Sequence, residues 1–210
     1  MFKYFAFLIL MLPSFAQKQI TNLNVILGGS FLERNEEFES SPKPDIGLTY
    51  SAGIEAEMHM GEGYLNWSPS IGLRYSKLGD GQEVFSVPTT SLFEVWEADF
   101  GIHYLPSFYE HQLGFGVSWA LPVAGTKKVL IGEEQELLEE YDIEFAGNVE
   151  KGIGMQSSLF IHFRYLYAFN SKYSLGIAFE QSATNALVNN GNALNNSRRS
   201  QLLFRFSYKI

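Results

Sequence analysis

The feature that most constrains the fold is an unbroken alternation of apolar and polar residues from Ile46 to Met60. Every even position in this run holds Ile, Leu, Tyr, Ala or Met, and every odd position holds Gly, Thr, Ser, Glu or His. Because successive side chains of a β-strand point to opposite faces, this period of two predicts a strand with one apolar and one polar face. The run is longer than the typical strand of a globular protein, which has about five or six residues. The sequence therefore predicts a long strand that separates two different environments.

Seven further segments alternate in the same way, which predicts an all-β chain. Phe160 and Leu166 interrupt the otherwise polar face of the sixth segment. Pro69 lies inside the third segment, and we expect a bulge there because proline cannot donate a ladder hydrogen bond. In chain order the eight predicted strands are 22–31, 46–60, 65–76, 96–104, 112–121, 153–167, 173–180 and 204–210.

The connections between these segments alternate strictly between short and long. Short turns are predicted near Glu62, Phe108 and Ser171. This alternation places all long loops at one end of an up-and-down sheet and both termini at the other, as in membrane barrels. The predicted fold is therefore an all-β, eight-stranded antiparallel up-and-down transmembrane β-barrel. The long loops are 33–45, 79–90, 126–151 and 185–200.

Residues 1–16 have the pattern of a signal peptide, and residues 17–210 form the predicted outer-membrane barrel domain. Lys3 supplies the positive start, an apolar stretch follows, and Ser14-Phe15-Ala16 fits a small-x-small cleavage site. The apolar stretch is too short to span a bilayer as a helix. We therefore expect export from the cytoplasm, with any membrane insertion made by strands.

The composition of the two strand faces separates a membrane barrel from a soluble one. The polar face is dense in Gly and Ser with single charges among them, which suits the narrow interior of an eight-stranded barrel. The other face is almost purely aliphatic and aromatic, which suits lipid. The alternative is a soluble secreted or periplasmic lipocalin-like barrel that binds an apolar ligand inside. In the membrane interpretation, the residues expected to contact lipid are Leu48, Ile54, Ile71, Phe100, Phe115 and Ile177.

Charged residues on the polar faces are the candidate site residues. Buried charges need partners, so we expect an ion-pair network in the barrel lumen. The network either fills and fixes the barrel or gates a narrow ion path, and a wide diffusion pore is not expected from eight strands. Its expected members are Glu55, Glu57, Arg74, Glu97, Asp99, Arg164, Glu180 and Arg205.

Arg164 and Glu180 are the one pair for which the sequence predicts a register. They share the inward parity and lie eight residues on either side of position 172, so we expect them to lie opposite or diagonal to each other and to interact.

Other chemistry is not predicted. The net charge of −8 argues against nucleic-acid binding, and the chain has no cysteine. The four histidines lack the close spacing of metal ligands, so we expect no metal site and no cofactor. A lipid A-modifying barrel enzyme is a further alternative, but no histidine lies beside a serine on the lipid face, and we expect no catalytic residue.

The stretch 126–151 carries eight acidic residues between Glu133 and Glu150, interspersed with apolar ones. One interpretation is a solvated acidic loop, because a run of charge specifies no partner by itself. The other is a hairpin above the membrane that docks a protein, a cationic ligand or divalent ions that bridge lipopolysaccharide. The Asn-rich stretch 185–196 is typical of a loop.

The alternating terminal strand resembles the sorting signal that the barrel-assembly machinery reads in small Gram-negative outer-membrane barrels. The whole mature chain is similar in pattern to the OmpA-like barrels and to the PorT-like barrels of Bacteroidota. This resemblance implies location in the cell outer membrane, contact with outer-membrane lipid and lipopolysaccharide, and a structural, surface-interaction or secretion-associated role. The residues of the signal are Phe204, Phe206, Tyr208 and Ile210.

Overall fold

The computed structural model describes residues 18–33, 44–59, 66–84, 87–143, 153–189, 192–193 and 197–210, and all regular structure in them is β-strand. The predicted signal peptide and the turn near Glu62 lie outside these residues. Eight long strands are β1 (Lys18–Glu33), β2 (Pro44–His59), β3 (Asn66–Val84), β4 (Val87–Tyr104), β6 (His111–Ile131), β9 (Ser158–Ala168), β10 (Tyr173–Ser182) and β13 (Arg198–Lys209). Five shorter strands are β5 (Ser107–Phe108), β7 (Glu136–Asp142), β8 (Ile153–Met155), β11 (Leu187–Asn189) and β12 (Asn192–Ala193).

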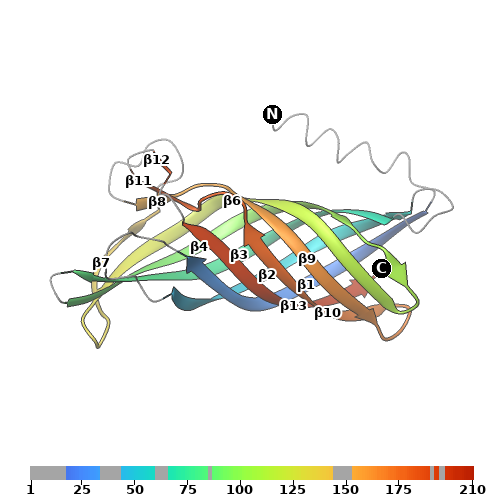
Figure 1. Ribbon diagram of the computed structural model, residues 1–210, viewed down its shortest axis with the longest axis horizontal. Coiled ribbons are helices and arrows are strands. Elements are labelled where there is room, and N and C mark those ends of the chain that lie inside the picture. Colours follow the sequence, from blue (N-terminus) through green and yellow to red (C-terminus); the bar gives the residue numbers. More distant parts are fainter. Residues whose placement is uncertain are drawn as a thin grey trace.

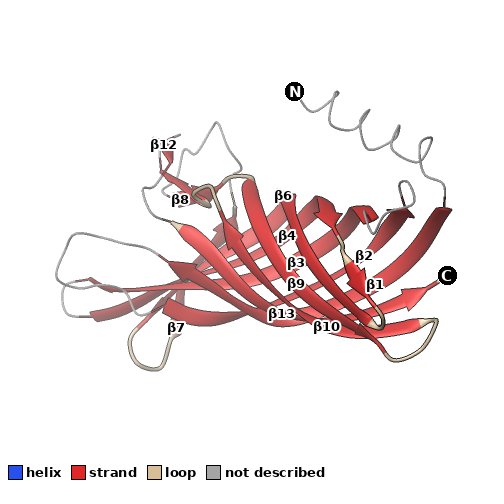
Figure 2. Ribbon diagram, turned by 45° about the vertical axis from the view of Figure 1, so that its right-hand side comes forward, coloured by secondary structure: helices blue, strands red, loops and turns tan. Residues whose placement is uncertain are grey.

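The eight long strands form a closed antiparallel barrel, which confirms the predicted fold class. Each long strand pairs with its predecessor along the chain, β1 pairs with β13, and the order is β4-β3-β2-β1-β13-β10-β9-β6 with a β4–β6 pairing that closes the ring. The strands run obliquely around the barrel (Figures 1 and 2). Because the ring formed by these eight described strands is closed, it has no free edge with unpaired backbone groups, and a bilayer interior requires that such groups be paired.

The two ends of the barrel differ. The connections at 105–110 and 169–172 are short, and they lie at the same end as the C-terminus (Figure 1). We call this the turn end and the opposite one the loop end. In the second of these turns, the side-chain oxygen of Asn170 accepts hydrogen bonds from the backbone N–H groups of Lys172 and Tyr173.

Pro69 does not produce the expected bulge. The β3–β4 ladder continues through Pro69, which lies opposite Ile102. On its other side, the β2–β3 ladder has the same register before and after this point, with Glu55 opposite Ser70 and Met58 opposite Trp67. The missing donor is therefore accommodated by a local gap in pairing. A register shift occurs instead between Trp96 and Glu97, where β6 carries one extra residue.

Three strands continue well beyond the predicted boundaries and form a sheet outside the ring. The predicted loop 79–90 is largely strand, because β3 and β4 stay paired as far as Val84 and Val87. The predicted loop 126–151 begins as the outer part of β6, which pairs with β7, so the expected hairpin is present up to Asp142. Residues 144–152 lie outside the described part of the chain. Figure 1 shows this extension, formed by β3, β4, β6 and β7, projecting from the loop end.

The sixth predicted strand is divided, which corrects the prediction of one strand over 153–167. Its first part, β8, leaves the barrel and pairs with β11, which also pairs with β12, inside the stretch predicted as a loop. Met155 has the parity of the apolar face of the predicted strand 153–167, but it is fully buried in an apolar cluster at the loop end. The cluster consists of Leu32, Leu78, Phe93, Val95, Ile143, Met155, Ala186 and Leu187.

The outer surface of the barrel is apolar between two groups of aromatic residues. Towards the turn end, the Trp67 and Tyr104 rings lie 5.6 Å apart, and towards the loop end Tyr75 contacts Tyr50 at 4.7 Å and Trp96 at 5.1 Å. The eight residue-to-residue steps from Trp67 to Tyr75 span about 26 Å of strand, or roughly 20 Å of thickness at a tilt of about 40°. Aromatic girdles that flank an apolar band of about this height are typical of membrane barrels.

The six residues expected to contact lipid all lie on strands of this outer surface. Five are strongly exposed, and Phe100 is half-buried between its neighbours. In the described part of the chain, no helix has the length and apolar character needed to span a membrane.

Candidate functional site

The inward faces of the strands carry nearly all of the buried charge. Of the eight charged residues expected there, six are almost fully buried, and the Asp99 side chain is 20% exposed. The side chain of Glu57 lies outside the described residues. The six buried residues are Glu55, Arg74, Glu97, Arg164, Glu180 and Arg205.

The first cluster surrounds Glu55 in the half of the barrel near the turn end. Its carboxylate accepts two hydrogen bonds from Arg164, one of 3.0 Å, and a further one from Arg205. Asn24 donates at 3.3 Å, and the Ser68 hydroxyl donates to the other oxygen. Five hydrogen bonds from four strands therefore hold one carboxylate, which offsets the cost of removing its charge from water.

The second cluster is centred on Arg74. Its guanidinium group lies 2.7 Å from Asp99 and 3.0 Å from Glu180, and it donates to Gln201 at 2.9 Å. Glu180 also lies 2.9 Å from Nδ1 of His162. Glu180 therefore has its partners on β3 and β9, and the predicted partner Arg164 is held by Glu55 instead. In the β9–β10 register, Arg164 lies opposite Ala178 and so diagonal to Glu180.

The third cluster, nearer the loop end, contains an arginine that the sequence analysis missed. Arg199 binds both oxygens of Glu97, at 2.6 and 2.8 Å, and donates to the Ser76 hydroxyl at 2.9 Å. Both charged groups are fully buried. Arg199 was assigned to the loop 185–200, whereas β13 begins at Arg198 and gives Arg199 the inward parity. Extending the alternation of the last strand towards the N-terminus is the signal that could have found it.

Phe160 links the second and third clusters. The guanidinium groups of Arg74 and Arg199 both lie over its ring, at 4.9 and 5.1 Å from the ring centroid. The aromatic residue that interrupted the polar face in the sequence is thus a cation–π partner of two buried arginines.

Glycines make room for these large side chains. A Cβ atom on Gly114 would lie 2.4 Å from Cγ of Arg164, and one on Gly116 would lie 2.5 Å from the ring of His103. At Gly114 and Gly116, glycine is therefore required by the bulk of the arginine and histidine side chains nearby.

The charges of the three clusters balance. Four carboxylates face four guanidinium groups, so the interior carries no net charge from these groups, and each charge has an opposite partner within an ion-pair distance. The carboxylates are those of Glu55, Glu97, Asp99 and Glu180, and the cations are Arg74, Arg164, Arg199 and Arg205.

One hydrogen-bonded chain has the connectivity of a serine hydrolase triad. The Ser118 hydroxyl lies 2.7 Å from Nε2 of His162, whose Nδ1 contacts Glu180. Ser118 is only 2% exposed and faces the packed interior, so a substrate has no access to its hydroxyl. These two contacts therefore orient the His162 ring within the barrel interior. Within the described residues, no group of three His, Cys, Asp or Glu side chains could hold a metal ion.

Comparison with known proteins gives matches only to solved structures. No protein-family model matches the sequence, and no curated protein matches it. Neisserial surface protein A is 10% identical, with 90% of this chain and 97% of that chain covered and a TM-score of 0.48. Ail of Yersinia pestis is 8% identical, with 92% and 100% covered and a TM-score of 0.45. The outer membrane protein OprG from Pseudomonas aeruginosa is 11% identical, with 91% and 97% covered and a TM-score of 0.36.

The geometry defines the class of protein. The interior of the barrel holds paired charges, and the outer surface holds Leu, Ile, Val and Phe between aromatic groups. A lipocalin-like carrier requires the reverse, an apolar interior that receives its ligand. A closed barrel that is charged inside and apolar outside is a transmembrane β-barrel.

Proposed function

We propose that this protein is an outer-membrane barrel that conducts no ions and catalyses no reaction, and that holds an interaction surface above the membrane. The observation that carries this proposal is the one-sided extension of β3, β4 and β6, together with β7, beyond the aromatic group around Tyr75. The nine residue-to-residue steps from Tyr75 to Val84 span about 30 Å of strand at roughly 3.3 Å per step. A membrane anchor alone does not need strands of this length.

The interior supports a closed barrel. Three ion-pair clusters lie in the lumen, and the apolar cluster at the loop end joins residues from β1, β3, β4, β8 and β11. An eight-stranded barrel has just enough room for its own side chains. The alternative that the ion-pair network gates an ion path is less well supported than the interpretation that the network fills and fixes the barrel, because each ion pair is held by additional hydrogen bonds.

The extension supports an interaction role because it is acidic and exposed. Strand β7 is exposed along nearly its whole length, including Glu136, Leu137, Leu138 and Glu139. On the neighbouring strands, Lys128 binds Glu94 at 3.2 Å, and this hydrogen bond raises the pKa of Lys128 above its usual value. The acidic groups of β7 favour a partner with a basic surface. We propose a protein partner here, contact of the outer surface with lipopolysaccharide, and recognition of β13 by the barrel-assembly machinery during insertion.

Single-cysteine labelling tests the location and orientation, since the chain has no cysteine of its own. Leu138→Cys places a thiol on β7, and Tyr109→Cys places a matched, exposed thiol in a turn-end connection. In intact cells, a membrane-impermeant maleimide should label Leu138→Cys and leave Tyr109→Cys unlabelled, whereas both should react after lysis. If only Tyr109→Cys were labelled in intact cells, the barrel would have the opposite orientation, and the proposed interaction surface would not face the cell exterior.

Planar-bilayer recordings test the closed interior. The purified barrel should give no steady conductance above the bare bilayer. A stable open conductance level would show that the clusters gate an ion path.

Cell fractionation tests the membrane location. Recovery of the protein in the soluble periplasm without detergent would rule out the membrane assignment.

A further inference from the structure

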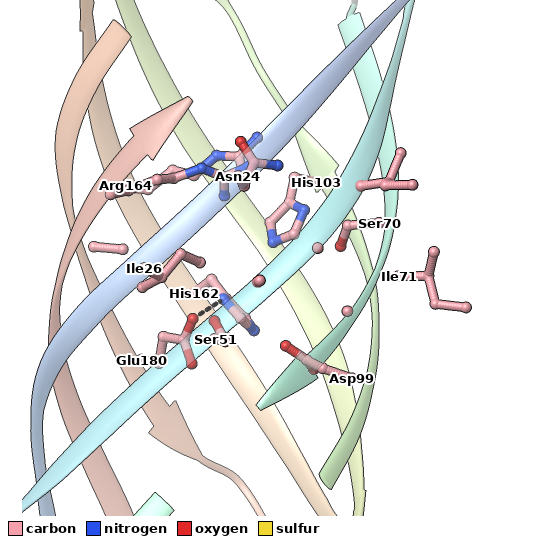
Figure 3. Close-up of a pocket in the computed structure, with 16 residues that line it drawn as sticks. Asn24, Ile26, Ser51, Ser70, Ile71, Asp99, His103, His162, Arg164 and Glu180 are labelled. Atoms are coloured by element: carbon pink, nitrogen blue, oxygen red, sulfur yellow. Dashed lines mark ion pairs between the residues drawn. The ribbon is translucent and has the colours of Figure 1, made fainter. Parts of the chain in front are cut away.

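A cavity of about 40 Å³ lies inside the barrel between the Glu55 and Arg74 clusters. Figure 3 shows its lining, which includes the His162–Glu180 pair together with Ser51, Arg164, Asn24 and His103. None of the ion pairs described above requires this space, so the cavity needs its own explanation.

The cavity exists because β2 and β3 present small residues at this level. Ser51 and Gly53 on β2, and Ser70 and Gly72 on β3, all belong to its lining. Gly53 lies directly opposite Gly72, and a Cβ atom on Gly53 would lie 2.6 Å from the carbonyl oxygen of Ile71. The close approach of the two strands thus excludes a side chain, and the space in front of them stays open.

Four buried polar atoms without a hydrogen-bond partner among the described residues are carried by residues of the lining. They are Oδ1 of Asn24, Oδ1 of Asp99, Nε of Arg164 and Oε2 of Glu180. The last of these lies 3.0 Å from Arg74 but forms no hydrogen bond with it. Leaving a buried polar atom unpaired costs about 1 to 3 kcal/mol, so three such atoms on the lining residues, together with the ion-paired Oε2 of Glu180, indicate a ligand that hydrogen-bonds with them.

The chemistry of the lining defines that ligand. Three of the four atoms are acceptors and one is a donor, so the ligand must donate several hydrogen bonds and accept at least one. Asp99 and Glu180 are balanced by Arg164 and Arg205 around the cavity, which gives neither a cation nor an anion a net attraction. A buried water molecule needs roughly 10 to 15 Å³ of cavity volume. The cavity, with about 40 Å³, therefore has room for about three water molecules.

We propose that the cavity is a binding site for a cluster of about three water molecules that joins the Glu55 and Arg74 clusters into one hydrogen-bonded network. The water molecules donate to the oxygens of Asn24, Asp99 and Glu180 and accept from Nε of Arg164. Through Glu180 the network continues to His162 and Ser118. This inference concerns the barrel interior and is independent of the proposed surface partner.

Filling the cavity distinguishes a wet site from a dry one by the sign of the effect. Ser51→Val adds apolar atoms at the cavity wall, and Ser51→Ala is the matched control that removes the hydroxyl without filling the space. Displacing the water removes the hydrogen bonds to these polar atoms, so the urea midpoint of unfolding in lipid vesicles should fall for Ser51→Val well below that of Ser51→Ala. A midpoint above that of Ser51→Ala would mean that the cavity is dry, because filling a dry cavity stabilises.

A crystal structure of the unaltered protein grown with thallium(I) tests the ligand directly and does not depend on the folding of a variant. We expect solvent density within hydrogen-bond distance of Oδ1 of Asp99 and Oε2 of Glu180, without anomalous signal. An anomalous peak would identify a monovalent-cation site, and absence of density would identify a dry cavity. Either result overturns the proposal.

Discussion

Arg164 and Glu55, which are 109 residues apart in the chain, form a two-pronged ion pair across the barrel interior. Both side chains are 1% exposed. Glu180, which lies diagonal to Arg164 on the adjacent strand, pairs with Arg74 and His162 instead. Ion pairing in this barrel therefore connects opposite walls more than neighbouring strands, and it fixes the cross-section as well as the register.

Replacing Glu55 with Gln should destabilise the barrel more than replacing Arg164 with Met. Loss of the Glu55 carboxylate leaves both Arg164 and Arg205 without their acidic partner, whereas loss of Arg164 leaves Glu55 bound to Arg205. Removing one partner of a buried pair costs about 3 to 5 kcal/mol. Urea titrations in lipid vesicles measure the free energies of unfolding. The double variant Glu55→Gln, Arg164→Met should recover part of the stability lost in Glu55→Gln. For Arg164→Met combined with Glu180→Gln, the two losses of stability should be closer to additive. The reverse pattern would contradict the observed pairing.

Phe160→Leu should destabilise the barrel by about 2 to 4 kcal/mol, because each of its two desolvated cation–π contacts contributes up to about 2 kcal/mol. The matched control is Phe163→Leu on the same strand, whose ring faces outward and is 47% exposed. The same vesicle titration compares the two. Equal effects would show that Phe160 acts only through its volume.

Ile71→Arg should cost about 2 to 4 kcal/mol, because Ile71 lies midway between Trp67 and Tyr75 on the outer face of β3 and so near the centre of the bilayer. Val87→Arg, in the extension beyond the aromatic group, should change the stability by less than about 0.5 kcal/mol. A negligible cost at position 71 would mean that the assignment of the two faces is inverted.

Gly114→Ala should destabilise by about 1 to 3 kcal/mol, because the added methyl group collides with Arg164, whose position is fixed by Glu55. Gly132→Ala, in the β6–β7 turn, meets no atom within 4 Å but has a φ of +78°, so only about 1 kcal/mol of backbone strain is expected. Thermal or urea unfolding of both variants separates steric from conformational effects, and a larger loss at Gly132 would contradict the packing of Arg164.

The alternation of side chains predicted the number of strands, their antiparallel order and the inward parity of residues such as Glu55 and Arg74, because these depend only on local periodicity. It could not predict that Arg164 binds Glu55, since contacts across a lumen depend on the tilt and stagger of all strands together. Nor could it locate the ends of β3 and β4, because strands that leave the membrane lose the apolar face that marks them. Arg199 was missed because the last strand was predicted to begin only at Phe204, which left Arg199 in a predicted loop.

The uneven height of the barrel wall gives the molecule a direction within the plane of the membrane. Strands β3, β4 and β6 continue outward as a sheet, while β9, β10 and β13 end near the level of the ring. A partner bound to that sheet would stand beside the axis, over the lipid next to the β3–β6 side of the barrel. If neighbouring barrels packed side by side in a regular way, the bound partners would all be oriented in a direction set by that packing. A regular arrangement of barrels in the membrane would therefore align the partners above it.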